Sequence, residues 1–396
     1  MMGYEPQRQV PLADVMRLVL PAELQTQLLR VCLLSGPEVR QGWEKWGQTK
    51  HVLGDSRYGL KRLLALLYHG LVRNQVPLEK ELQTYLRSAY VHEQSRTEVV
   101  RRACREALVC LAERDMPAVV LKGMMAAETV YPEACLRHCH DLDLLVAPGR
   151  RDAAAHALVE AGFRPAAAPR GGPEPARVLE HGCGFPVSLH ANLFRLVPYN
   201  LGLDDVWQRL VTVTVAGVQA QALSPADNLV HICGHAATVG SRSPGWAADA
   251  WFLISRHPEL DWDRVLRSAA AGHLALPLLV TLEYLVAALD APVPWRVLEA
   301  LRAHAASAGS VSREATLAAA LLSTRGRPFE LLKSSQGRRR FQVARWLVLP
   351  PPQSLRWLEG PVPAWWIPWL YLYRPVRYVV RVLARFVRNL LGGGEP

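Results

Sequence analysis

The chain has 396 residues, half of them hydrophobic, and carries a formal net charge of +11 at neutral pH. This length and apolar content exclude an intrinsically disordered protein and leave room for two or three globular domains. The positive charge comes mainly from arginine and favours anionic partners such as nucleotides, nucleic acid or an acidic membrane surface, without choosing among them.

The pattern of cysteines and apolar segments bears on the cellular location. The seven cysteines are an odd number spread along the chain, which fits a reducing cytoplasm better than a disulfide framework. The first residues lack a basic stretch followed by an apolar core, so no signal peptide is expected. Because no window holds about 18 uninterrupted apolar residues, no membrane-spanning helix is expected. The sequence therefore predicts a cytoplasmic protein.

The predicted elements change character along the chain. Residues 10–115 have leucines and alanines at helical spacing, which predicts helices. Short β-branched runs then alternate with helical segments, and the predicted strands are MPAVVLKG at 116–123, DLDLLVAP at 141–148 and FPVSLHANLF at 185–194. This alternation predicts a small α/β unit inserted between helical regions.

These changes divide the chain into four predicted parts. They are a helical region at 1–115, an α/β core at 116–222, a second helical region at 223–325, and a tail at 326–396. The tail begins with the basic, loosely patterned segment GRPFELLKSSQGRRRFQ, which we interpret as a linker. The predicted fold class is therefore α+β and predominantly helical.

Asp141 and Asp143 stand two residues apart in the second predicted strand. Side chains alternate along a strand, so both carboxylates share one face while Leu142 and Leu144 point into the core. Two parallel carboxylates repel each other, and a divalent cation removes that repulsion and accepts their hard oxygen donors. The Asp-x-Asp motif alone is weak, however, and taken by itself it is explained better by a solvated strand end with two surface acids.

The neighbouring residues favour a phosphate site. Lys122 and Gly123 end the first predicted strand at its turn into a helix, where backbone N–H groups and a cation can meet phosphate oxygens. Arg137 precedes Asp141 by four residues and can add a second phosphate contact or pair with the aspartates. This combination is far less common than either motif alone.

The stretch VVLKGMMAAETVYPEACLRHCHDLDLLV resembles the core of the uncharacterised nucleotidyltransferase family, part of the polymerase-β-like superfamily. That family has a strand ending in Lys-Gly, a helix closing on Tyr-Pro, and Arg-x-x-x-Asp-x-Asp leading into an apolar strand. The chain supplies these in order as Lys122, Gly123, Tyr131, Pro132, Arg137, Asp141 and Asp143. Weaker similarity extends over roughly residues 15–300.

The resemblance implies a small palm-like sheet, flanked by helical regions, that binds a nucleoside triphosphate and two Mg²⁺ or Mn²⁺ ions. Lys122, Gly123 and Arg137 would contact phosphates, and Asp141 and Asp143 would hold the metals. The implied reaction moves a nucleoside monophosphate to an acceptor and releases pyrophosphate. The acceptor is unknown, since a metabolite, a sugar, a protein side chain and RNA all remain open; nothing strongly indicates nucleic acid binding.

The third predicted strand departs from the family pattern. Where the family often has acid–apolar–His, with the acid as a third metal ligand, this chain has Ser188 and retains His190. A hydroxyl is a poorer Mg²⁺ ligand than a carboxylate. Two interpretations follow: another acid such as Glu180 completes the site, or the chain is a catalytically degenerate nucleotide-binding or scaffold protein of the same fold.

The tail combines aromatic residues with a stripe of arginines. The aromatic residues are Trp365, Trp366, Trp369, Tyr371 and Tyr373, and the arginines are Arg374, Arg377, Arg381, Arg385 and Arg388. Aromatics beside a basic amphipathic helix suit peripheral contact with an anionic membrane. Equally, the helix can pack on its own domain with the arginines facing water.

Overall fold

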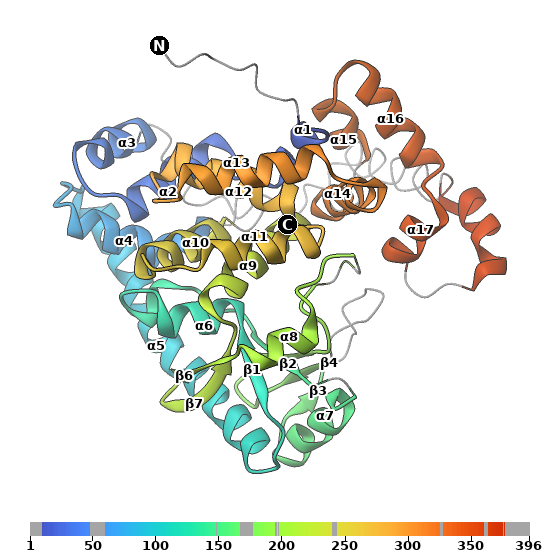
Figure 1. The fold of residues 1–396 in the computed structure, drawn as a ribbon. Coiled ribbons are helices and arrows are strands. Elements are labelled where there is room, and N and C mark those ends of the chain that lie inside the picture. The colour runs from blue at the N-terminus through green and yellow to red at the C-terminus, as the bar shows by residue number, and fades with distance from the viewer. Residues whose placement is uncertain are drawn as a thin grey trace, which may run out of the picture.

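The computed structural model describes residues 10–47, 60–147, 149–166, 177–194, 196, 198–239, 244–324, 328–359, 363–374 and 376. Figure 1 shows one sheet with its own flanking helices, joined to a larger body of helices. Before the sheet come α1 (Ala13–Met16), η1 (Arg17–Val19), α2 (Glu23–Leu33), α3 (Pro37–Gly47), η4 (Leu60–Leu63), α4 (Leu64–Arg73) and α5 (Lys80–Ala112). After the sheet come α9 (Pro225–Val239), α10 (Gly245–Arg256), α11 (Trp262–Ala271), α12 (Ala275–Leu289), α13 (Trp295–Ala306) and α14 (Ser310–Ser323).

The sheet has seven strands in the order β3-β4-β5-β2-β1-β7-β6. They are β1 (Ala118–Leu121), β2 (Leu142–Val146), β3 (Arg164–Pro165), β4 (Arg177–Glu180), β5 (Pro186–His190), β6 (Val211–Val215) and β7 (Val218–Ala222). Between them lie α6 (Lys122–Thr129), η5 (Ala134–Leu136), α7 (Arg151–Glu160) and α8 (Leu203–Gln208). Strand β1 is antiparallel to β2 and parallel to β7, and β2 is parallel to β5. This mixed sheet in a largely helical chain confirms the predicted fold class.

The three predicted strands correspond to β1, β2 and β5 in the centre of the sheet, but the outer strands were not predicted. Strands β6 and β7 form a hairpin whose two turn residues, Ala216 and Gly217, both have positive φ, at 52° and 76°. Such a two-residue turn matches the twist of the strands that it joins. At the other edge, β4 pairs with β5 and β3 pairs with β4, both antiparallel.

The two faces of the sheet belong to different cores. On one face Val120, Leu142 and Leu144 pack with buried residues of α5 and α7. On the other face Val119 and Leu145 join the core of the helical body, which includes α9, α10 and α12. Asp143 shares a face with Leu145, because they are two apart on β2. The second half of α5 thus packs on the sheet, although the predicted boundary at residue 115 assigns α5 and the sheet to different parts. The division of the chain into four parts stays a prediction.

Most of the described part of the linker expected at 326–342, which is residues 328–342, is helical instead. The described part of the tail forms α15 (Pro328–Ser334), α16 (Gly337–Val348), α17 (Pro352–Glu359), η6 (Ala364–Trp366) and a last helix over residues 367–374. Leu331, Val343 and Trp346 are buried in the core of the helical body, so these few apolar residues suffice to fix α15 and α16. Within the described residues, no helix has both the length and the apolar character needed to cross a membrane.

A glycine lets α4 pack directly on α2. A Cβ atom at Gly70 would lie 2.5 Å from the Val31 carbonyl oxygen and 3.0 Å from the Cys32 Cα atom. Both are backbone atoms and cannot rotate away, so the two helices must separate to admit a larger residue.

We therefore expect Gly70→Ala to lower the free energy of unfolding by about 1–3 kcal/mol in urea denaturation. Gly42→Ala on α3 is the matched control, because its Cβ would meet only the Val31 Cγ2 atom, at 3.8 Å. Alanine is the better helix former, so that variant should be as stable as the wild type or slightly more so. Equal destabilisation of both variants would contradict this account of the α2–α4 contact.

Candidate active site

The carboxylate of Asp143 lies at the centre of the residues that the sequence singled out. In the sheet, Asp143 is paired with Leu121 of β1 on one side and with Ser188 of β5 on the other. Its Oδ2 atom is 3.1 Å from Lys122 Nζ and its Oδ1 atom is 2.6 Å from His190 Nε2. Each oxygen of this carboxylate, which is only 7% exposed, therefore has a nitrogen partner.

These partners keep Asp143 ionised. Burial alone would raise its pKa, but Lys122, followed by His190, holds the pKa of this carboxyl well below its usual range. At neutral pH the site thus contains a buried anion neutralised by protein groups. The repulsion expected between the two aspartates is relieved at Asp143 by these protein groups, even without a metal ion.

The backbone of Lys122 is held in an uncommon conformation. Lys122 has a φ of 55° and is the first residue of α6, directly after β1. A non-glycine residue in the left-handed region is destabilising unless its surroundings hold it there. Here the turn brings the ammonium group to Asp143, and this contact is the geometric reason for a lysine at the strand end.

Asp141 lies just before β2 with its side chain 16% exposed, and its Oδ1 atom is 3.5 Å from His140 Nε2. Burial, followed by the charges of Arg62 and Arg137, lowers the pKa of His140 to about 4. His140 is therefore neutral at pH 7 and contributes no charge to Asp141. Asp141 is also the more exposed of the two carboxylates, at 16% against 7% for Asp143.

Arg137 is bound to an aspartate that lies outside the Asp-x-Asp motif. Its Nε and Nη2 atoms donate to the two carboxylate oxygens of Asp249 on α10, at 2.6 and 2.9 Å. The Tyr131 hydroxyl donates to the same carboxylate at 2.8 Å. This geometry gives Arg137 a structural role that joins the Asp-x-Asp segment to the helical body; the predicted phosphate contact remains a prediction.

Gly123 lies against Cys139 and Arg137. A Cβ atom at Gly123 would lie 3.3 Å from Cys139 Sγ and 3.7 Å from Arg137 Cζ. A side chain at this position would thus press on the Cys139 sulfur, while its contact with Arg137 would be an ordinary one.

Ser188 occupies the place beside Asp143 where a third carboxylate was sought. It is buried and shares its face with Asp143 and His190. Glu180 is exposed on β4 opposite Pro186, two strand spacings from β2, or roughly 10 Å. Within the described residues, no group of three His, Cys, Asp or Glu side chains is arranged to hold a metal ion.

Two histidines of α9 that were not predicted for the site lie over the same face of the sheet. His231 is fully buried, and its Nε2 atom donates to the Leu193 carbonyl oxygen at 3.1 Å. Burial, then Lys122, lowers the pKa of His231 to about 3, and the same causes lower that of His235. The spacing of four residues was visible in the sequence, but nothing local placed it near Lys122. Both rings are neutral at pH 7, so they add no charge beside Asp143.

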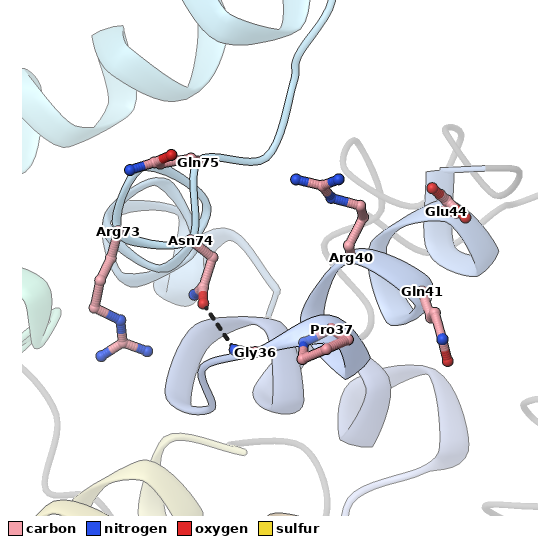
Figure 2. A pocket seen from close by; sticks show the side chains of 8 residues that line it. All are labelled: Gly36, Pro37, Arg40, Gln41, Glu44, Arg73, Asn74 and Gln75. Carbon is pink, nitrogen blue, oxygen red and sulfur yellow. Dashed lines mark hydrogen bonds between the residues drawn. The ribbon is translucent and has the colours of Figure 1, made fainter.

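A separate open hollow of about 480 Å³ lies between α3 and the end of α4. Figure 2 shows its lining, which includes Arg40 and Arg73 but none of the predicted site residues. Arg73 donates to the Leu33 and Leu34 carbonyl oxygens at 3.0 and 2.8 Å, which close the end of α2. This arginine is engaged in the helix connection, so the hollow does not extend the candidate site.

The Arg137–Asp249 pair can be tested against an exposed pair. Asp249→Ala would leave the Arg137 charge buried without its partner, so we expect unfolding free energy to fall by about 3–5 kcal/mol. Asp152→Ala is the control, since Asp152 is 3.0 Å from Arg177 but both side chains are mostly exposed, and its loss should cost less than about 1 kcal/mol. Similar losses in urea denaturation would show that Asp249 does not anchor the site segment.

Comparison with known proteins gives one family and one solved structure. The chain matches the family described as uncharacterised nucleotidyltransferase over residues 60–290, more than half of its length. It also has similarity to a crystal structure of an antigenic nucleotidyltransferase-like protein from Paracoccidioides brasiliensis, at 18% identity and a TM-score of 0.32, covering 52% of this chain and 95% of that one. No curated protein matches. The matched region contains Lys122, Gly123, Arg137 and both aspartates, and the chain belongs to the uncharacterised nucleotidyltransferase family.

Proposed function

We propose that the protein transfers a nucleoside monophosphate from a nucleoside triphosphate to an acceptor hydroxyl and releases pyrophosphate. One observation carries the proposal: Asp143 is a buried, ionised carboxylate between Lys122 and His190, with Asp141 two residues before it. A buried anion with a lysine on one oxygen is suited to exchange that lysine for a bound cation. Membership in the family supports the reaction class.

Asp141 and Asp143 suit a divalent cation through the chemistry of their donors. Mg²⁺ is usually held by one or two carboxylates together with phosphate oxygens of the substrate. These two aspartates therefore fit one Mg²⁺ or Mn²⁺ ion. Such an ion would neutralise the triphosphate and polarise its α-phosphorus for displacement.

Lys122 has a second role in this proposal. In the structure its ammonium group neutralises Asp143; Asp143 and Asp141 would hold the metal ion, which would supply that neutralisation in place of Lys122. The released lysine would then meet a phosphate oxygen, since one charge-assisted contact replaces another. Meanwhile Arg137 stays on Asp249 and holds the segment that carries both aspartates, so positioning comes from the protein and not from the nucleotide.

A second function remains open because of Ser188. This hydroxyl stands beside Asp143 where a third carboxylate would bind the metal that activates the acceptor. Without that ligand the protein would be a catalytically degenerate scaffold that binds a nucleotide and does not transfer it. The two functions differ in one observable, the release of pyrophosphate by the wild-type chain.

The proposal predicts that Asp143→Asn and Asp141→Asn each lower nucleotide transfer by at least about a hundredfold, as loss of a transition-state contact does. The measurement is pyrophosphate release from each nucleoside triphosphate with Mg²⁺ and a panel of acceptors. Asp152→Asn, an exposed acid on α7, should leave the rate unchanged. Wild-type turnover in both Asp143→Asn and Asp141→Asn would place the chemistry elsewhere.

The position of Ser188 gives a prediction with two readouts. Ser188→Asp should raise single-turnover transfer while leaving nucleotide affinity nearly unchanged. Because the new carboxylate faces Asp143, it should also lower the melting temperature without metal, and Mg²⁺ should restore it. Ser188→Ala is the control, since it removes the hydroxyl without adding charge.

Slower transfer in Ser188→Asp, together with a metal-independent loss of stability, would show that Ser188 does not stand at a ligand position. Nucleotide binding without pyrophosphate release in the wild type, combined with release in Ser188→Asp, would establish the scaffold function instead.

A further inference from the structure

The short helix η6 and the last described helix together expose an aromatic face. We use this name for Trp365, Trp366, Trp369, Leu372, Tyr373 and Val376, all of which are exposed. Trp365 is 69% exposed, Trp369 57% and Leu372 67%. Large apolar side chains that share one helix face and remain this exposed usually mark a binding surface.

The orientation of this face is fixed by the other side of the helix. Ile367 and Leu370 are buried against Leu355 of α17 in a small core of their own. Arg374 is 3% exposed, with its Nε atom 3.6 Å from Glu359 Oε1. The helix therefore turns its arginine toward the protein and its tryptophans toward solvent, the reverse of what burial of apolar surface alone would give.

Helix α16 adds a second exposed apolar surface with basic residues beside it. Phe341, 73% exposed, is followed at helical spacing by Arg345 and Val348, which are also exposed. Leu349 is exposed directly after the helix. Helix α16 is thus a second place in the described tail where exposed apolar and basic side chains lie together.

The positive charge of the tail favours an anionic partner. Residues 328–396 contain eleven arginine or lysine residues and three acidic residues, so most of the net charge of the chain lies here. In the sequence after Val376, apolar residues continue at the same spacing as Val380, Leu383, Val387 and Leu390, and arginines follow Arg374 in a parallel stripe. A surface of tryptophan and tyrosine within a strongly basic segment matches the interface of an anionic bilayer, where indole rings and arginines are both favoured.

We propose that the aromatic face binds the surface of a membrane that contains anionic lipids. The tryptophans would enter the interfacial layer, with the helix in the membrane plane. The basic residues would add attraction to the headgroups. This binding is separate from the proposed transfer reaction, because the surface shares no residue with the candidate site.

The test is flotation of the full chain with vesicles. Wild type should bind vesicles of equal parts phosphatidylglycerol and phosphatidylcholine, and bind phosphatidylcholine vesicles more weakly, with the difference shrinking at high salt. Trp365→Ser/Trp369→Ser/Leu372→Glu should weaken binding at least about tenfold, a loss of about 1.4 kcal/mol. Trp295→Ser is the control, since Trp295 is 72% exposed on α13 and should bind like wild type.

The altered side chains are exposed, so the triple variant should keep the wild-type melting temperature. Absence of wild-type binding to anionic vesicles, or equal binding by the triple variant, would overturn the proposal. So would protection of Trp365 and Trp369 from hydroxyl-radical labelling without lipid, because another copy or another segment of the chain would then cover the face. A dimer that the triple substitution dissociates would assign the surface to a second copy.

Discussion

The largely buried pairing of Arg137 with Asp249 is the contact on which the candidate site depends. It connects the segment before the two aspartates to α10, and Tyr131 and Gly123 complete its surroundings. Two charges removed from water stabilise a fold only when their hydrogen bonds are satisfied, and here both carboxylate oxygens accept from the guanidinium. Burial would lower the pKa of Arg137, but Asp249 raises it, so the arginine stays charged.

A second electrostatic balance operates a few residues away. Asp143 is ionised in a buried place because Lys122 and His190 are bound to it. This carboxylate has already been removed from water and neutralised by the protein. Its desolvation therefore adds no cost when a ligand binds, which is a form of preorganisation. The strained backbone of Lys122 shows that the turn holds the ammonium group there at some energetic cost. Two cations are thus each paired with an aspartate in this region, Arg137 with Asp249 and Lys122 with Asp143.

The candidate site and the aromatic face lie on different parts of the chain and follow different physics. At the site, the charged groups Asp143 and Arg137 are held by specific partners within the protein. On the tail, apolar groups are exposed while Arg374 is buried against Glu359. The helix keeps this orientation because Ile367 and Leu370 are buried against α17. The tryptophans are therefore left available to a nonaqueous surface.

The sequence by itself determined the centre of the sheet and the family. Strands β1, β2 and β5 are short β-branched or alternating runs, and alternation along β2 placed Asp143 opposite the core residues Leu142 and Leu144. The alternation of Val and Thr in β6 before Ala216 and Gly217 was a local signal for a hairpin that the prediction missed. The place of this hairpin in the sheet, however, is set by the pairing of β7 with β1 and not by the residues of the hairpin itself.

Tertiary structure alone decided the partners of the charged residues. Arg137 and Asp249 are 112 positions apart. No local pattern indicates that Arg137, four residues before Asp141, binds Asp249 instead. Likewise, helical spacing separated Arg374 from the aromatic residues of the tail, but which of them faces the protein depends on Leu355 and Glu359 of α17. The period of side chains is a property of the backbone that sequence reveals, whereas the identity of a contact is fixed only when distant elements pack.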